Sequence, residues 1–480
     1  MDPYSPERSY DAVVVGSGPN GLSAAIRLAQ EGLSVCVLEA NQTIGGGTRS
    51  AALTLPGFLH DVCSAVHPLG VGSPFFRRLP LQKFGLEWLH PEFPLAHPLD
   101  GACAATLQRS VLATAAGLEG DRGSYQRLMA PLVADWESLA AELLQPLLHL
   151  PDRPVQLARF GWRAFRSAVG LANARFEEAP ARALLGGLAA HSFLALEQIP
   201  SAAIGLVLAM MGHAVGWPSP RGGSQQIANA LARLLRSMGG ELLTGCRVDT
   251  LDQLPRARAI LLDVTPRQLL GLAVNKLPAS YATRLERFRY GPGIFKIDYA
   301  LSGPIPWTAQ SCRRAGTVHL GGSLEEVSRA EGEVVQGRLP EKPFVLLAQP
   351  SLFDSTRAPQ GRHTAWAYCH VPNGSSFDMT QRVEDQIERF APGFRDLILA
   401  RHTANCASLE RENPNLIGGS IDGGLTSPWQ LLARPVLSPA PYRTPVPGLY
   451  LCSASTPPGA GVHGMCGFNA AEVALRDRFA

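Results

Sequence analysis

The stretch from residue 10 to residue 39 constrains the fold of this chain more than any other part of its sequence. It starts with a short apolar run, Tyr10 to Val15, of the kind that forms a strand buried in a parallel sheet. Three glycines follow with the spacing G-x-G-x-x-G, and a helix is expected to run from the third glycine to Gln30. A second strand, Ser34 to Leu38, ends at an acidic residue. We therefore expect a βαβ unit that binds a dinucleotide.

Each glycine and the acid have a physical role in such a unit. Gly16 permits the tight turn, Gly18 lets the backbone approach a pyrophosphate, and Gly21 lets the helix pack close to the strand. The helix N-terminus presents N–H groups to the pyrophosphate, because the helix dipole favours negative charge there. Glu39 is placed to accept hydrogen bonds from an adenosine ribose. The alternative is a glycine turn that binds no nucleotide. The positions of the helix and the acid, which are those that a nucleotide site requires, disfavour this alternative.

A second glycine cluster indicates which cofactor is bound. Residues 45–47 are all glycine and precede Thr48 and Arg49. This arrangement resembles the E-x5-G-G-R signature of flavoenzymes with the glutathione-reductase-like FAD fold, found in amine oxidases and phytoene desaturases. Gly47 stands where that signature has arginine, so Arg49 is the alternative source of positive charge. A flexible loop is the simpler explanation of the glycines, but their position shortly after Glu39 favours noncovalent FAD over NAD.

The composition disfavours several classes of protein. The chain of 480 residues is long enough for two or three domains, and its 46% hydrophobic and 17% charged residues are typical of a globular protein. A net charge of +3 gives no reason to expect nucleic acid as a partner. Nine dispersed cysteines without a C-x-x-C pair indicate neither a metal site nor a disulfide framework. Residues 1–9 lack an apolar signal-peptide segment and no apolar run is long enough to span a membrane, so a cytoplasmic location is predicted.

Helix and strand patterns divide the chain into three interleaved parts. Residues 120–215 have mainly helical periodicity, including a buried apolar helix from Ala202 to Val215. Strands are expected at 241–248, 259–264, 292–303, 316–322, 344–350 and 450–453, and helices at 224–238, 383–391 and 464–478. The predicted FAD-binding domain comprises residues 1–75, 216–290 and 430–480, the predicted substrate domain comprises residues 76–119 and 291–429, and residues 120–215 form a helical lid or insert.

The C-terminal segment carries a resemblance to a known family. Residues 445–475 read PVPGLYLCSASTPPGAGVHGMCGFNAAEVAL, a short strand, a glycine loop and a helix. With GSGPNGLSAA, LEANQTIGGG, LPGFLHDVCSAVHP, RGGSQQIANAL and GPGIFKIDYAL, the chain resembles phytoene desaturase-related FAD-dependent oxidoreductases, including the pyridine nucleotide-disulphide oxidoreductase domain 2 branch. The resemblance implies an α/β fold of the amine oxidase superfamily. In that fold a glutathione-reductase-like Rossmann FAD-binding domain is interleaved with a mixed-sheet substrate domain and a helical insert.

The resemblance also implies where the cofactor lies. In this family the C-terminal loop lies against the flavin, and the strand containing Val248 reads the adenine through its backbone. Ser453 and Ala454 replace a Gly-Asp or Gly-Ala pair of the family, which affects the expected ribityl contact. The residues predicted to contact FAD are Gly16, Gly18, Pro19, Asn20, Gly21, Glu39, Ala40, Gly45, Gly46, Gly47, Thr48, Arg49, Val248, Ala454, Gly464, Met465 and Asn469.

Two residues are candidates for a catalytic role. Lys296 lies in an apolar strand that resembles the amine-oxidase segment whose lysine holds a water near flavin N5. Alternatively, Lys296 points to solvent or pairs with Asp298 or Glu286. His463 lies in the loop expected to face the flavin, where an acid/base or stacking role competes with a simple hydrogen bond to the backbone.

The remaining histidines and nucleotide motifs give less information. No sequence spacing indicates a catalytic or metal-binding partner for His60, Asp61, His67 or His191. No second complete dinucleotide-binding βαβ unit is expected beside the one at residues 10–39, so oxygen, a quinone or another diffusible acceptor is expected to reoxidise the flavin.

Residues 154–176 place arginines among apolar and aromatic residues. A basic amphipathic helix of this kind can lie on an anionic membrane surface, and desaturase relatives are peripheral on membranes. A lid helix with a solvated basic face is the alternative. The segment therefore suggests a hydrophobic substrate and a peripheral membrane contact.

These features lead to one main functional prediction and two alternatives. The protein is expected to oxidise or desaturate a hydrophobic substrate, preferably a polyene or isoprenoid, by hydride transfer to flavin N5. Amine oxidation, or isomerisation by a reduced flavin, is the first alternative. A non-catalytic prenyl- or lipid-binding protein on the same fold is the second, which the intact glycine motifs disfavour.

Overall fold

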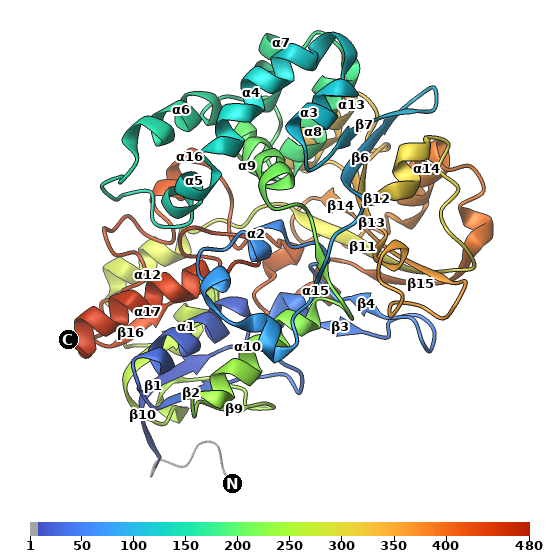
Figure 1. Ribbon diagram of the computed structural model, residues 1–480. Coiled ribbons are helices and arrows are strands. Elements are labelled where there is room, and N and C mark those ends of the chain that lie inside the picture. The colour runs from blue at the N-terminus through green and yellow to red at the C-terminus, as the bar shows by residue number, and fades with distance from the viewer. Residues whose placement is uncertain (1–7) are drawn as a thin grey trace.

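The computed structural model describes residues 8–480 and consists of two sheets and a group of helices. Most of the N-terminal segment in which no signal peptide is predicted, residues 1–7, lies outside the described residues. Figure 1 shows a parallel sheet at the lower left, a larger mixed sheet on the right, and helices α4–α9 at the top. The predicted α/β architecture, with a parallel sheet that contains the βαβ unit, a mixed sheet and a helical insert, is confirmed.

The smaller sheet has five parallel strands in the order β16-β10-β1-β2-β9. Its central strands are short apolar runs with both faces covered, as expected of a parallel sheet. Helices α1, α10 and α17 cover one face, while α11 and α12 lie over the other. The elements are β1 (Ser9–Val15), β2 (Val35–Leu38), β9 (Glu241–Leu243), β10 (Arg256–Leu262), β16 (Leu449–Leu451), α1 (Pro19–Gln30), α10 (Gln225–Ser237), α11 (Pro266–Leu272), α12 (Ala279–Glu286) and α17 (Met465–Arg478).

The larger sheet has seven strands in the order β15-β11-β14-β13-β12-β6-β7. All neighbouring strands are antiparallel except β12 and β6, so the sheet is mixed. Helix α14 covers its outer face, and the helical region covers the other. The elements are β6 (Phe93–Leu99), β7 (Cys103–Leu107), β11 (Gly293–Leu301), β12 (Ala315–Leu320), β13 (Val345–Ala348), β14 (His363–Val371), β15 (Ile398–Ala404), α13 (Leu324–Val335), α14 (Thr380–Phe390) and α15 (Cys406–Glu412).

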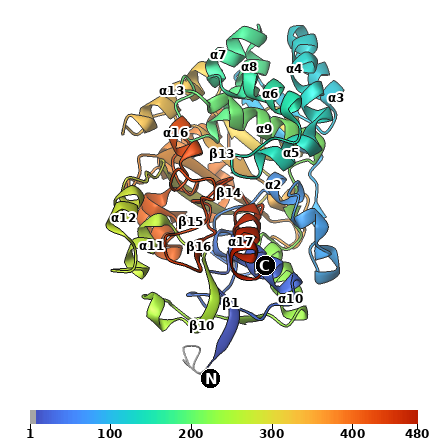
Figure 2. The same cartoon turned by 90° about the vertical axis from the view of Figure 1, so that its left-hand side faces the viewer.

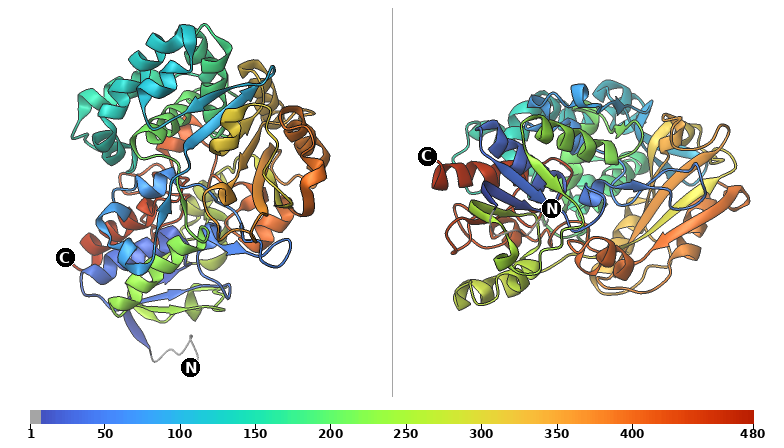
Figure 3. Two further views of the ribbon diagram at one scale, coloured as in Figure 1. Left: turned by 45° about the vertical axis from the view of Figure 1, so that its right-hand side comes forward. Right: turned by 90° about the horizontal axis from the view of Figure 1, so that it is seen from below.

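The helical region packs against the inner face of the mixed sheet and forms one core with it. Figure 2 shows this region above both sheets, and the left view of Figure 3 shows it above the parallel sheet and beside the mixed sheet. Helix α9 is nearly continuous in buried residues, which confirms the buried helix expected from Ala202 to Val215. The helices are α3 (Val111–Ala116), α4 (Arg122–Ala134), α5 (Trp136–Leu143), α6 (Pro154–Ala164), α7 (Ala168–Arg175), α8 (Ala179–Ala190) and α9 (Ser201–Ala214). Helices α2 (Pro68–Val71) and α16 (Pro428–Leu432) and strand pairs β3–β4 (Ser50–Ala51, His60–Asp61) and β5–β8 (Trp88–Leu89, Ser219–Pro220) complete the fold.

Two predicted elements are wrong in extent. The strand expected over residues 241–248 ends at Leu243, because a turn follows in which Gly245 has a φ of +70°. Val248 therefore lies beyond the strand. The single helix expected over residues 154–176 is two helices, because the Ser167 hydroxyl accepts a hydrogen bond from Gly170 N at 3.1 Å and caps a new helix. Within residues 8–480, no helix is both long and apolar enough to cross a membrane.

Candidate functional site

A cavity of about 750 Å³ extends from the glycine turn of the parallel sheet to the inner face of the mixed sheet. Its size is within the range of small-molecule and cofactor sites. The turn before α1, the end of β2 and the loop before α17 line one end. Helix α9 and strands β12, β13 and β14 line the other. The cavity therefore joins the predicted nucleotide site to the predicted substrate region.

The glycine turn forms a cradle that larger residues would fill. Gly16 has a φ of +101°, which favours glycine. A Cβ on Gly21 would lie 2.1 Å from the carbonyl oxygen of Gly16, so the helix can begin this close to the strand only with glycine there. A Cβ on Gly46 would lie 3.3 Å from the Cα of Gly18, so the two glycine clusters meet at the cavity wall. This backbone surface fits a pyrophosphate at the N-terminus of α1.

Glu39 directly follows β2 at the cavity wall, as expected for a ribose-binding acid. Its Oε2 accepts hydrogen bonds from Ser17 N at 2.9 Å and Ser17 Oγ at 2.6 Å. Its Oε1 accepts from Asn41 N at 2.9 Å and Asn41 Nδ2 at 3.2 Å. A carboxylate has about four acceptor positions, so ribose binding requires one of the two side-chain donors to turn away.

Asp263 is a cavity-lining acid that the sequence motifs did not reveal. It follows β10, and its Oδ2 accepts a hydrogen bond from Gly21 N at 3.0 Å. The same oxygen would lie 2.7 Å from a Cβ on Gly18. Burial, with a smaller contribution from the charge of Glu39, raises the pKa of Asp263 from 3.8 to about 7, although the hydrogen bond from Gly21 N acts in the opposite direction. A titrating carboxyl thus lies beside the predicted pyrophosphate position.

Most of the predicted FAD contacts line the cavity, and the others lie behind its wall. The lining residues are Gly16, Gly18, Pro19, Asn20, Glu39, Ala40, Gly46, Gly47, Thr48, Val248 and Ala454. The residues that do not line it are Gly21, Gly45, Arg49, Gly464, Met465 and Asn469.

The residues behind the wall have structural contacts. The guanidinium of Arg49 forms an ion pair with Glu412 at 2.9 Å and donates from Nε to Gly46 O at 3.1 Å. A Cβ on Gly464 would lie 2.1 Å from Ser23 Oγ, so this glycine lets α17 begin against α1. The Asn469 Nδ2 donates to Leu144 O at 3.2 Å.

Lys296 is buried and forms an ion pair with Asp298, which is one of the alternatives that its sequence left open. It does not point to solvent, since only 1% of its side chain is exposed. In the β11–β14 register it lies opposite Tyr368, a cavity-lining residue, and its Nζ is 5.8 Å from the ring centre of Trp366. Lys296 therefore belongs to the cavity face of the sheet, one layer behind the lining side chains.

His463 does not line the cavity, although its loop does. Its Nδ1 accepts a hydrogen bond from Met465 N at 3.0 Å, and the ring is fully buried. Burial lowers the pKa of His463 to about 4, so the ring is neutral near pH 7. These contacts match the simpler of the two expectations, a histidine that orders the loop.

Three residues that have no partner nearby in the sequence, Asp61, His67 and His191, each contact a residue from a distant part of the chain. Asp61 forms a buried ion pair with Arg357, and His67 Nε2 is 2.7 Å from Ser224 Oγ. His191, at the end of α8, lines the cavity, and its Nε2 is 3.0 Å from His319 Nε2 on β12. Sequence spacing could not reveal these pairs, because their members are more than 100 residues apart.

Comparison with known proteins extends the structural result. The chain is 28% identical to mouse (Mus musculus) pyridine nucleotide-disulfide oxidoreductase domain-containing protein 2, over 98% of this chain and 94% of that protein. It is 25% identical to the phytoene desaturase (neurosporene-forming) of Rhodobacter capsulatus, over 95% of this chain and 92% of that protein. A putrescine oxidase variant shares the fold with a TM-score of 0.62 and 17% identity, over 98% of this chain and 97% of that chain. The resemblance read from the sequence is confirmed.

The family assignment agrees with the geometry of the glycine cradle. The model of the FAD dependent oxidoreductase family matches residues 11–269, which include the glycine turn, the ribose acid and the second glycine cluster. The enzymes of this family carry FAD, so the predicted cofactor is confirmed. With a cradle for the pyrophosphate and a cavity that leads from it to a second sheet, this chain belongs to the FAD dependent oxidoreductase family.

Proposed function

We propose that this FAD-dependent oxidoreductase oxidises or desaturates a neutral, largely apolar substrate, preferably a polyene or other isoprenoid. The observation that carries the proposal is the chemistry of the cavity end farthest from the glycine turn. This end is lined by residues from two ranges, 191–217 and 317–368. None of the lining side chains from these ranges carries a charge. Six of them are aromatic or aliphatic: Phe193, Ile204, Val207, Leu208, Trp217 and Leu346.

The charge distribution supports a neutral substrate over an ammonium ion. A buried cation without a paired anion carries a large desolvation cost. The buried carboxylates near this end, Asp298 and Glu331, already hold Lys296 and His370. A protonated amine would therefore find no carboxylate among the lining residues of 191–217 and 317–368. Asp422, which lines the cavity elsewhere, lies beside the buried guanidinium of Arg434.

In the proposed reaction, the residues that line the cavity bind and orient the substrate. When bound, FAD supplies a two-electron acceptor for a hydride from substrate carbon. The aromatic and aliphatic wall excludes water and holds an apolar chain by burial of its surface. The pair of Lys296 and Asp298 adds no net charge behind that wall.

A spectroscopic experiment separates this proposal from its alternatives. FAD-loaded protein is mixed anaerobically with farnesene, with neutral isoprenoid extracts and, separately, with primary amines. Bleaching of the flavin band by a neutral isoprenoid, with a product lighter by two hydrogens, is the expected result. Bleaching by amines alone would favour amine oxidation, and conversion that requires pre-reduced flavin would favour isomerisation. Binding without any flavin-dependent conversion would favour a lipid-binding protein.

Oxygen or a quinone is proposed as the acceptor that reoxidises the flavin. The second G-x-G-x-x-G spacing of the sequence, Gly459, Gly461 and Gly464, belongs to a loop that lines the same cavity as the first, whereas a nicotinamide cofactor needs a docking site of its own. Rapid mixing of the reduced protein with oxygen, a soluble quinone or NADP⁺ tests the proposal. Reoxidation by NADP⁺ alone would contradict it.

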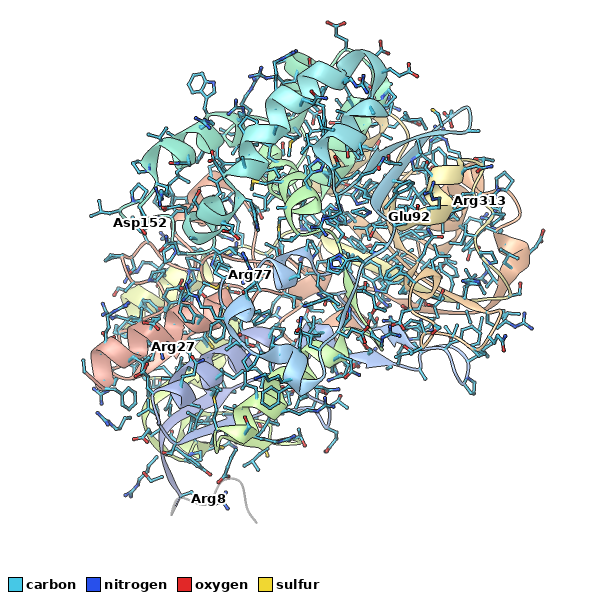
Figure 4. All side chains as sticks on the ribbon, in the orientation of Figure 1. Arg8, Arg27, Arg77, Glu92, Asp152 and Arg313 are labelled. Atoms are coloured by element: carbon cyan, nitrogen blue, oxygen red, sulfur yellow. The ribbon has the colours of Figure 1, made fainter. Side chains whose placement is uncertain are left out.

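The helical region is proposed to contact an anionic membrane surface through the segment 150–165. Leu150 is 94% exposed and Trp162 is 83% exposed, which is unusual for large apolar side chains. Arg163 lies beside Trp162 on α6 and adds positive charge. Asp152, in the connection before α6, lies at the outer edge of the molecule in Figure 4. Helix α6 packs on α9, whose other side lines the cavity, so this contact would face a lipid source of substrate.

Flotation with vesicles tests this contact. Wild-type protein should float with vesicles that contain phosphatidylserine, and Trp162→Ser should weaken binding. Leu112→Ser is the matched control, because Leu112 is 67% exposed on α3, outside this segment. Equal binding of the wild type and Trp162→Ser would contradict the contact.

A further inference from the structure

At the cavity end that is proposed to hold the substrate, one nitrogen of the His191 imidazole has no protein partner among the described residues. His191 ends α8 and lines the cavity. Its Nε2 is 3.0 Å from Nε2 of His319, a fully buried residue of β12. Its Nδ1 makes no hydrogen bond to any residue in the described part of the chain. The edge of the Trp217 indole, 5.9 Å away between ring centres, limits rotation of the imidazole.

Both imidazoles are neutral near pH 7. Burial lowers the pKa of His191 to about 3, and His370 acts in the same direction. Burial also lowers the pKa of His319 well below its usual value of 6.5, and His191 and His97 add to this effect. In a hydrogen bond between two neutral imidazoles, one Nε2 donates and the other accepts. His191 Nδ1 therefore offers either a lone pair or an N–H to the cavity, depending on which tautomer the pair adopts.

Two further polar groups on the same sheet face lack partners. Thr317 and Trp366 both line the cavity and are 1% and 5% exposed. Thr317 Oγ1 and Trp366 Nε1 are buried with no hydrogen-bond partner among the described residues. In the sheet register, Ala348 lies between these two residues, so their side chains are on one face. A buried polar atom left unpaired carries a free-energy cost, which a polar group of a ligand can remove.

Other ionisable groups around His191 are held in pairs. Behind the wall, His370 Nδ1 is 2.7 Å from Glu331 Oε2. His97 lies on the far side of His319, and His97 Nε2 is 2.8 Å from Gly322 O. Burial lowers the pKa of His97 to about 4, so its ring is neutral near pH 7. The groups that face the cavity here are thus uncharged hydrogen-bonding atoms within an apolar wall.

We infer that His191, with Thr317 two residues before His319 on β12, forms a subsite for one neutral oxygen function of the substrate, a hydroxyl or a carbonyl. The inference rests on the proposed apolar substrate and narrows it to an isoprenoid that carries such an oxygen. Either tautomer of the histidine pair can serve, since a hydroxyl both donates and accepts, and a carbonyl accepts from an N–H. A carboxylate or an ammonium group would be buried without a counter-charge.

Equilibrium dialysis of FAD-loaded protein with two matched probes tests the subsite. Farnesol and farnesene share an isoprenoid skeleton, and only farnesol has a hydroxyl. The wild type should bind farnesol about tenfold more tightly than farnesene, the effect of one buried hydrogen bond. His191→Phe should reduce this ratio to about one while keeping the affinity for farnesene within about threefold.

Two variants control for altered folding or shape. His191→Asn keeps a neutral hydrogen-bonding side chain and should retain a preference for farnesol over farnesene. Phe193→Leu changes an apolar residue of the same wall and should weaken both probes equally, so the ratio is unchanged. A ratio near one in the wild type, or an unchanged ratio in His191→Phe, would overturn the subsite and leave the proposed apolar substrate standing. Failure of both probes to bind would overturn the apolar substrate and the subsite together.

Discussion

Replacement of Asp263 by asparagine is predicted to remove a pH dependence of FAD binding. Asp263 is buried, and its Oδ2 accepts a hydrogen bond from Gly21 N at 3.0 Å in the turn that receives the pyrophosphate. Glu39 is the ionisable carboxyl nearby, and Cys452 and Cys466, also close, have pKa values that burial raises. The two thiols therefore stay neutral near pH 7, where Asp263 changes charge. An ionised Asp263 repels the pyrophosphate, and a protonated one does not.

The sign and size of the effect follow from the raised pKa. Because the folded protein holds the proton more tightly than the unfolded chain, this carboxyl contributes stability that is complete below pH 3.8 and is lost as the pH rises through about 7. The change in pKa from 3.8 to about 7 corresponds to about 4 kcal/mol, as an order of magnitude. Asp263→Asn keeps the oxygen that accepts from Gly21 N and does not titrate. Its stability advantage over the wild type should grow from pH 4 to pH 7 and then level off.

FAD titration of the apoprotein, followed by the quenching of flavin fluorescence, measures the effect on binding. Wild-type affinity should fall by up to about tenfold for each pH unit above 7, because FAD binds the protonated form of Asp263 better. The affinity of Asp263→Asn should be nearly constant from pH 6 to pH 8.5. Urea unfolding of both apoproteins at pH 5 and pH 8 gives the stability comparison. Parallel pH profiles for the two proteins would refute the reasoning.

Three further substitutions test other parts of the site. Gly18→Val should abolish FAD content, because even a Cβ would lie 2.7 Å from Asp263 Oδ2; normal flavin content in the purified variant would exclude this turn as the pyrophosphate site. Lys296→Met leaves Asp298 buried without its partner and should lower the free energy of unfolding by about 3–5 kcal/mol. If Lys296 also acts near the flavin, reoxidation by oxygen slows in Lys296→Met, whereas an unchanged rate assigns the lysine a structural role alone. Gly467→Ala should destabilise the packing of α17 on α1, since its Cβ would lie 1.8 Å from Asn20 O; an unchanged melting temperature would contradict this contact.

The parallel sheet was largely predictable because its signals are local. Residues 10–39 contain the whole pattern of the βαβ unit: two apolar runs, which form β1 and β2, and a glycine turn, which precedes α1. Helix α9 was found for the same reason, as one long apolar segment. The domain boundaries drawn from the sequence stay a prediction.

The mixed sheet was less predictable because its strands pair over long distances. Strand β14 is buried over nearly its whole length and reads HTAWAYCHV, without the alternation of polar and apolar residues that marks a half-buried strand. Its partner β11 begins 70 residues earlier in the chain. Helix α13 could have been found, because Ser323 and Glu326 form a capping box that is visible in the sequence.

The site was predictable where a motif defines it and not where residues meet in space. Gly16, Gly18 and Glu39 lie at the cavity wall as their motif predicts. Asp263 and His191 carry no motif, and their neighbours Gly21 and His319 are 242 and 128 residues away in sequence. Arg49, predicted as a cofactor contact, does not line the cavity; it pairs with Glu412 and donates to Gly46 O, and its contact with the cofactor stays a prediction.

The visible spectrum of the FAD-loaded protein under anaerobic conditions, before and after addition of neutral isoprenoids, tests the proposed reaction most directly. A hydride donor bound between α9 and the mixed sheet should bleach the flavin band in a single turnover and yield a product lighter by two hydrogens. Primary amines should leave the band unchanged. A flavin band that amines bleach and neutral isoprenoids do not would contradict the assignment of an apolar, uncharged substrate.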